Sequence, residues 1–149
     1  MASLSFSAAV AGWAEKVPEA VEAVRNESAK EVVRDMQTLR SEGGRMRFKT
    51  GFLWSSLMAS TSAMPRINPG AQPADGGSYS FEFGQVEAVI AGASLDDTLY
   101  FGYTAAYAAH REYGANGQPA DGFVRMAAMN WNQIVNRNAQ KVGKAFGLL

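Results

Sequence analysis

Residues 124–146 read VRMAAMNWNQIVNRNAQKVGKAF and carry the clearest pattern in the chain. Their apolar residues recur at steps of four, three, four, four, three and four, the period of one face of an α-helix. These residues are Val124, Ala128, Trp131, Val135, Ala139, Val142 and Phe146. Asp121 precedes them at a position suited to an N-cap. The pattern predicts one C-terminal helix that begins after Asp121 and buries this stripe, Trp131 included, against a sheet.

A second amphipathic helix is predicted over residues 18–39. Pro18 suits the first turn of a helix, and Gly43 with Gly44 suits its end. The helical face consists of Val21, Val24, Val32, Met36 and Leu39. The apolar residues before Pro18, which are Phe6, Val10 and Trp13, fit either a helix or a strand.

The middle of the chain has a β-like pattern. Tyr79, Phe81 and Phe83 alternate with polar residues, which is typical of a half-buried strand. Further strands are expected over 86–91 and 98–103, and a weaker one over 57–63. Residues 65–77 contain three prolines and three glycines and predict a long, mobile, exposed loop. The expectation is therefore one α+β domain over residues 1–149. In it, a long N-terminal helix and a C-terminal helix pack on a three- or four-stranded, mainly antiparallel sheet.

Composition excludes several kinds of chemistry. The 149 residues include no cysteine and one histidine, His110, so thiol catalysis and cysteine- or histidine-rich metal sites are ruled out. Residues 44–50, GRMRFKT, are similar to a phosphate-binding loop but lack its second glycine and follow a helix. In 110–112 the neighbouring side chains of His110, Arg111 and Glu112 diverge on a helix and cannot form a catalytic relay. We expect no enzyme, no cofactor and no metal site, and no segment that spans a membrane.

Charge is unevenly distributed although the net charge is zero. Residues 40–66 carry five basic and one acidic side chain, and 122–149 carry four basic and none acidic. Residues 67–121 carry one basic and seven acidic side chains. This asymmetry suits head-to-tail contact between copies and suits pairing within one chain equally well. Arg45, Arg47 and Lys49 are candidate DNA-facing residues if the segment is extended, and form a solvated loop otherwise.

Two segments resemble a known family. Residues 49–57, KTGFLWSSL, resemble a Thr-Gly-x-Leu-x-x-Ser-hydrophobic motif, and 107–114, YAAHREYG, resemble a Tyr-Ala-x-x-x-Glu-aromatic-Gly motif. A short loop and then Phe123 at the start of a helix follow, as in that family. The family is that of bacteriophage tail components, called neck, tail-completion or tail-terminator proteins of long-tailed phages. The resemblance covers roughly residues 21–135.

The resemblance implies a structural virion protein at the head–tail junction, made in the host cytoplasm. Copies would form a ring, by resemblance a hexamer, that closes the tail tube and docks to the head connector or stopper protein. DNA would pass through its lumen without sequence-specific contact. The alternative is a soluble DNA-binding accessory protein that uses the basic 45–49 segment and the basic last helix.

The motif residues are expected to act in structure or assembly. They are Thr50, Gly51, Leu53, Ser56, Tyr107, Ala108, Glu112, Tyr113, Gly114 and Phe123. Thr50 suits the cap of a short helix, Tyr107 and Tyr113 suit anchors of another, and Gly114 suits a left-handed turn that ends it. Glu112 either caps or pairs within the fold, or contacts a neighbouring subunit.

Overall fold

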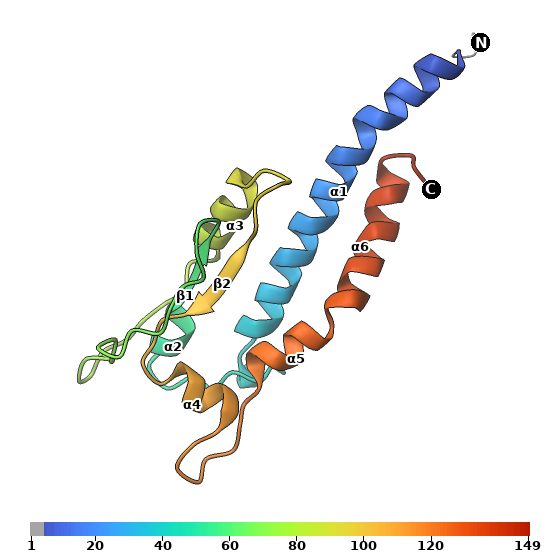
Figure 1. Ribbon diagram of the computed structural model, residues 1–149. Coiled ribbons are helices and arrows are strands. Elements are labelled where there is room, and N and C mark those ends of the chain that lie inside the picture. Colours follow the sequence, from blue (N-terminus) through green and yellow to red (C-terminus); the bar gives the residue numbers. More distant parts are fainter. Residues whose placement is uncertain (1–4) are drawn as a thin grey trace.

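The computed structural model describes residues 5–149 and is dominated by a long helix, α1 (Phe6–Gln37). Figure 1 shows α1 between a helix from the end of the chain on one side and a hairpin with a short helix on the other. The hydroxyl of Ser5 caps α1 by accepting the backbone N–H of Ala8 at 3.2 Å. The prediction that the helix begins at Pro18 is wrong, because Pro18 lies inside it. Since proline lacks an N–H, the carbonyl of Ala14 loses its helical partner there.

The chain turns after α1 through a short 3-10 helix, η1 (Arg40–Glu42), and Gly43 in a left-handed conformation. A single turn of helix, α2 (Phe52–Ser55), follows and leads directly into β1 (Leu57–Ser60). β1 pairs antiparallel with β2 (Tyr100–Tyr103), with Leu57 opposite Tyr103 and Ser60 opposite Tyr100. The strands predicted over 57–63 and 98–103 are thus confirmed in shortened form.

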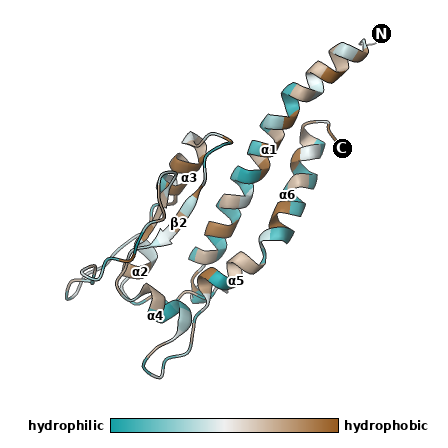
Figure 2. Cartoon of the chain, viewed as in Figure 1, coloured by the Kyte–Doolittle hydropathy of each residue, from teal (hydrophilic) through white to brown (hydrophobic). Residues whose placement is uncertain are grey.

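The expected three or four strands are not found, because within residues 5–149 the sheet contains two. The predicted strand over 86–91 lies in a helix, α3 (Phe83–Gly92). Val86 and Ile90, four residues apart, are both buried, and Figure 2 shows α3 mostly in the hydrophobic colours. The alternating Phe81 and Phe83 pack edge to face on one another, at a centroid distance of 6.2 Å, without joining a strand. A short apolar run fits a helix and a strand equally well. Here the run forms a helix, because one helical face is buried.

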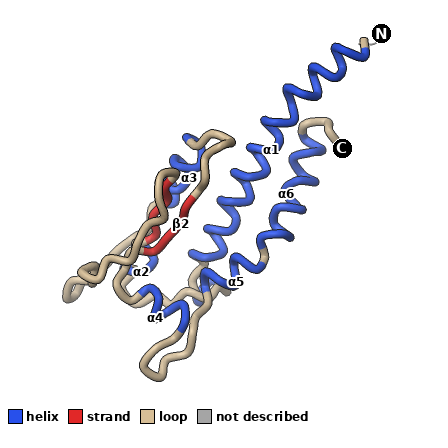
Figure 3. Tube along the Cα trace, in the orientation of Figure 1, coloured by secondary structure: helices blue, strands red, loops and turns tan. Residues whose placement is uncertain are grey.

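The C-terminal helix predicted over 124–146 is divided into two helices, α5 (Phe123–Met129) and α6 (Trp131–Ala145). The short helix expected between Tyr107 and Tyr113 is α4 (Ala108–Tyr113). Long loops, tan in Figure 3, join β1 to α3 and α4 to α5. α6 packs against α1, and not on the sheet as predicted. Asp121 is not an N-cap either, because Gly122 occupies that position for α5.

The buried face of α6 differs from the predicted stripe. Val142 of the stripe is buried as predicted, but the other buried side chains, Ile134 and Asn138, lie outside the stripe. Trp131 is 39% exposed, so the prediction of a buried Trp131 is wrong. The amide Nδ2 of Asn138 donates to the hydroxyl of Ser28 on α1 at 3.2 Å. A polar pair therefore stands at the centre of this helix contact, where an apolar pair would be expected.

The hydrophobic core lies between α1, α3, α5 and the hairpin. Its largest fully buried side chains include Phe123, Met46, Ile90 and Val33. At its centre the ring of Tyr103 meets Phe123 edge to face at 5.1 Å, and its hydroxyl donates to Oε1 of Gln37 at 2.6 Å. Burial, with the charge of Glu112 nearby, raises the pKa of Tyr103 well above its ordinary value.

The loop predicted over 65–77 is exposed over most of its length and has no regular secondary structure. It is tied to the residues after β2 by two backbone hydrogen bonds. The N–H of Asn68 donates to the carbonyl of Thr104 at 2.9 Å, and the N–H of Ala106 donates to Ala71 at 3.0 Å. Both ends of its first half are therefore attached to the body.

Candidate functional site

An open cleft of about 1050 Å³ lies where η1, the segment before α2, and α4 come together. Basic side chains line it from three separate stretches: Arg40, Arg47, Lys49 and Arg111, with His110 beside them. Aromatic side chains line it as well, among them Phe48, Phe52 and Tyr107. Cations combined with aromatic faces suit a phosphate-bearing or carboxylate-bearing partner.

The two segments of the resemblance meet in this cleft. The rings of Phe52 and Tyr107 have centroids 6.3 Å apart, although 55 residues separate them. The hydroxyl of Thr50 accepts the N–H of Phe52 at 3.2 Å and so stabilises the start of α2, close to the predicted capping role. Burial raises the pKa of Tyr107 above its ordinary value.

Gly51 is required by its conformation and by its surroundings. Its φ of 84° lies in the left-handed region, which residues with a side chain adopt with difficulty. A Cβ at this position would stand 2.2 Å from the carbonyl oxygen of Tyr79. The chain at Tyr79 is held there because its N–H donates to the carbonyl of Thr50 at 2.9 Å. The motif glycine therefore allows the segment after the long loop to lie directly on α2.

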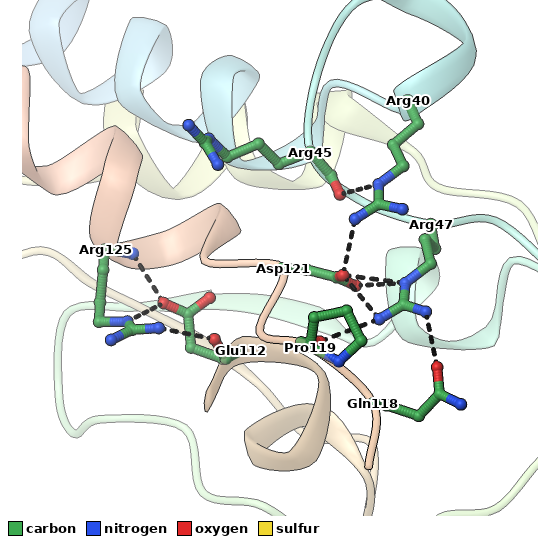
Figure 4. A network of polar contacts seen from close by, with 8 residues as sticks. All are labelled: Arg40, Arg45, Arg47, Glu112, Gln118, Pro119, Asp121 and Arg125. Carbon is green, nitrogen blue, oxygen red and sulfur yellow. Dashed lines mark hydrogen bonds and ion pairs between the residues drawn. The ribbon is translucent and has the colours of Figure 1, made fainter. Parts of the chain in front are cut away.

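Glu112 is buried, at 5% exposure, and its carboxylate acts at the start of α5. It accepts the N–H of Val124 at 3.0 Å and the N–H of Arg125 at 2.8 Å, two groups that no earlier turn of helix could satisfy. Arg125 also donates to it through Nε at 3.1 Å. The capping and pairing role within the fold is thus present in the single chain (Figure 4).

Asp121 is the second buried carboxylate, at 2% exposure, and it joins two basic residues of the cleft. Arg40 donates to it at 2.9 Å, and Arg47 donates through Nε at 2.9 and 3.0 Å to its two oxygens. Hydrogen bonding to Asp121 raises the pKa of Arg47. Figure 4 shows both guanidinium groups directed at the carboxylate. Sequence reasoning missed this pairing, because 74 to 81 residues separate the partners and no local pattern links them.

The candidate DNA-facing residues do not share one face. Arg47 is bonded to Asp121 and lines the cleft, as does the exposed Lys49. Arg45 is exposed, and in Figure 4 its side chain points away from that of Arg47. Its backbone carbonyl accepts a hydrogen bond from Nε of Arg40 at 3.1 Å.

The remaining motif residues divide between core and surface. Leu53, Ser56, Ala108 and Phe123 are buried, and Ser56 Oγ donates to the carbonyl of Leu53 at 2.8 Å. Tyr113 is 64% exposed and is not buried as an anchor, but its ring lies 4.7 Å from the guanidinium carbon of Arg125. Gly114 ends α4 with a φ of 84°, though its ψ of 151° differs from the left-handed helical value.

Within residues 5–149 no three side chains of the His, Cys, Asp and Glu types come close enough to hold a metal ion. No described helix combines the length and the apolar character needed to cross a membrane. Comparisons of the chain with protein-family models, with curated proteins and with solved structures give no match.

Proposed function

We propose that this chain is a structural virion protein whose copies form a ring at the head–tail junction of a phage or phage-like particle. The ring closes the tail tube, presents a face to the head connector or stopper protein, and leaves a channel for DNA. Six copies follow from the resemblance alone. The role is mechanical, and the chain performs no catalysis.

The observation that carries this proposal is the meeting in space of the two resembling segments and of the helix start that follows them. Phe52 of the first lies against Tyr107 of the second. Glu112 of the second caps α5, which begins at Phe123 after the short loop. The signature residues therefore form one folded unit, which supports the view that they are a motif and not a chance match of two short strings.

Surface properties support assembly. Large apolar side chains stand exposed at the start of α1, with Phe6 at 86% and Trp13 at 59% exposure. Exposed apolar patches of this kind mark contact surfaces in soluble proteins. A ring requires one surface of each copy to meet a different surface of the next copy, so that the rotation closes. The uneven charge of the chain suits such an arrangement.

The second candidate is the DNA-binding accessory protein, and the cleft is the observation that favours it. Lys49 and Arg111 stand beside Phe52 and Tyr107, a combination that fits the backbone and bases of single-stranded DNA. Against it, Arg47 is already bonded to Asp121. A salt titration of DNA binding separates the two candidates. The logarithm of the binding constant falls linearly with the logarithm of the salt concentration, and each neutralised phosphate steepens this slope by about 0.7 for single strands. A slope beyond about 3 would favour the accessory protein.

Native mass spectrometry and electron microscopy of the purified chain test the ring. We expect a closed ring of several copies with a central opening. In a phage that carries the gene, its deletion is expected to leave filled heads and tails unjoined. A chain that stays monomeric at every concentration and also within particles overturns the proposal.

A further inference from the structure

The first turns of α1 extend past the end of α6, as Figure 1 shows, and we name residues 6–16 the overhang. Its apolar side chains are exposed: Phe6 at 86%, Val10 at 47% and Trp13 at 59%. A helical segment of this length gains little stability in water from its own hydrogen bonds. Burial of these three side chains against a partner would supply the stabilisation that this part of the helix lacks in the single chain.

The spacing of these residues shows what kind of partner they fit. Phe6, Val10, Trp13, Val17, Ala20 and Val24 follow one another at steps of four, three, four, three and four. This is the heptad seam of a helix that packs lengthwise against other helices. Ala20 is buried at 7% exposure, whereas the overhang is uncovered. The seam thus has a partner over its second half only.

A groove of about 550 Å³ adjoins the seam, between α1 and α6. α1 lines it with Val17, Val21 and Val24, and α6 lines it with Trp131, Val135 and Ala139. The three α6 residues belong to the stripe that the sequence predicted as core. In the described part of the chain the polar residues of the lining are Arg25 and Gln140. Arg25 donates to the carbonyl of Ser94 at 2.6 Å.

The overhang fits this groove by its chemistry but cannot reach the groove of its own chain. It is the direct continuation of the helix that forms one wall, so only another copy can supply it. Residues 6–14 contain no charged side chain and can enter an apolar groove without burying a charge. Glu15, which follows, meets an α6 that carries Lys141 and Lys144 and no acidic residue.

We infer that the overhang of one copy lies in the α1–α6 groove of another copy. The inference rests on the proposed assembly of copies and names the contact that joins them. Phe6 and Trp13 would bury about 150–250 Å² each. Their sum stays below the roughly 800 Å² per partner of a standard interface. One such contact is therefore weak, and stable assembly requires that every copy both gives and receives an overhang.

The absence of cysteine allows a direct test. One batch of the full chain carries Ala14→Cys in the overhang, and a second carries Gln140→Cys at the groove. The two are mixed at an assembling concentration and treated with a short bis-maleimide linker. Because each copy holds one thiol, a 14–140 product arises only between copies. Ala14→Cys mixed with Ser62→Cys, at an exposed position in the loop after β1, is the matched control.

We expect the 14–140 product to exceed the 14–62 product at least about tenfold. Assembled rings without this excess overturn the inference and leave the ring intact. If the 14–140 product forms but the assembly is a dimer in which two copies exchange overhangs, the inference is supported and the ring is overturned. A chain that is monomeric throughout overturns both.

A second measurement uses the assembly constant. Trp13→Ser should raise the concentration needed for assembly at least about tenfold, as loss of a buried interface tryptophan does. The melting temperature of the monomer should stay unchanged, because Trp13 is 59% exposed and lies outside the core formed by the described residues. Met129→Ser, at a residue that is 74% exposed and outside the groove, is the control and should alter neither quantity. Equal effects of the two substitutions would contradict the inference.

Discussion

Arg125 donates three hydrogen bonds to Glu112: through its backbone N–H at 2.8 Å, through Nε at 3.1 Å, and through Nη2 to the carbonyl oxygen at 2.9 Å. The pair fastens the end of α4 to the start of α5. Glu112 thus completes a helix that begins eleven residues later, at the N-terminal end where a negative charge is favourable.

Glu112→Gln should lower the free energy of unfolding by about 1.5–3 kcal/mol, because hydrogen bonds to a buried charged group are lost. Thermal and urea unfolding measure the change. Glu87→Gln, at an exposed position on α3, should have no such effect. An unchanged melting temperature together with impaired assembly would instead assign Glu112 to a contact between subunits.

Asp121→Asn should destabilise the chain by about 3 kcal/mol, at the lower end for a broken buried ion pair. The lower end applies because the side chains of Arg40 and Arg47 remain 51% and 27% exposed and can be rehydrated. The sequence Gln-Pro-Ala-Asp-Gly occurs at both 72–76 and 118–122, so Asp75→Asn is a control with the same neighbours. Asp75 is exposed, and its substitution should leave stability unchanged. Similar losses of stability for Asp121→Asn and Asp75→Asn would show that the buried ion pairs of Asp121 are not the cause.

Phe123→Ala should cost about 3–5 kcal/mol, since the side chain is 2% exposed in the core. Trp131→Ala should cost well under half as much in the monomer, because the indole is 39% exposed. Urea denaturation of both variants measures the difference. If Trp131→Ala unfolds the monomer as strongly as Phe123→Ala does, α6 buries the face that the sequence pattern predicted.

Gly51→Ala should prevent folding or shift it to much lower temperature, because it combines a positive φ with a clash against Tyr79. Gly117→Ala separates the two causes. Gly117 has a φ of 78°, but a Cβ added there would stand in open space. Gly117→Ala should therefore lower the free energy of unfolding by about 1–2 kcal/mol. Melting temperatures of the two variants provide the comparison. Equal decreases in melting temperature would show that the chain at Tyr79 moves away and removes the clash with the added Cβ.

Stability should fall as the pH rises above about 10, at up to about 1.4 kcal/mol per pH unit for Tyr103. The folded chain holds the phenol proton that the unfolded chain releases, because burial raises the pKa of Tyr103. The contribution is complete below the unfolded pKa and is lost between the two pKa values. Tyr103→Phe should flatten this alkaline slope, whatever its effect at pH 7. A slope identical to that of the wild type would contradict the assignment.

Local patterns predicted the packed part of α1, the helical character of residues 124–146 and the two paired strands. They failed where packing decides between a helix and a strand. Val86 and Ile90 fit a strand and a helix equally well, and the burial of one face of α3 against α1 and β1 selects the helix. The stripe through Val135 and Ala139 is a true apolar face of α6. Periodicity does not show whether an apolar face meets the core of its own chain or lines an open groove.

The candidate site shows the same division. Thr50 and Glu112 act at helix starts, a role that their residue types suggest. The sequence predicts the same role for Asp121, yet its carboxylate is bonded to Arg40 and Arg47, which lie 74 to 81 residues earlier in the chain. Its twin at Asp75, within an identical five-residue sequence, is exposed. Five residues of sequence do not determine which aspartate is buried, since the arginines that pair with it come from a distant segment.

Pro18 stands where the overhang joins the part of α1 that is packed in the body. A helix resists bending through its successive backbone hydrogen bonds, and the bond missing at the carbonyl of Ala14 weakens α1 against bending at this point. The overhang, about 16 Å long, is thus a helical segment that can bend relative to the rest of the chain at Pro18. Its direction can differ from copy to copy while the body keeps one shape, so an assembly built through such segments can absorb differences in spacing without repacking any core.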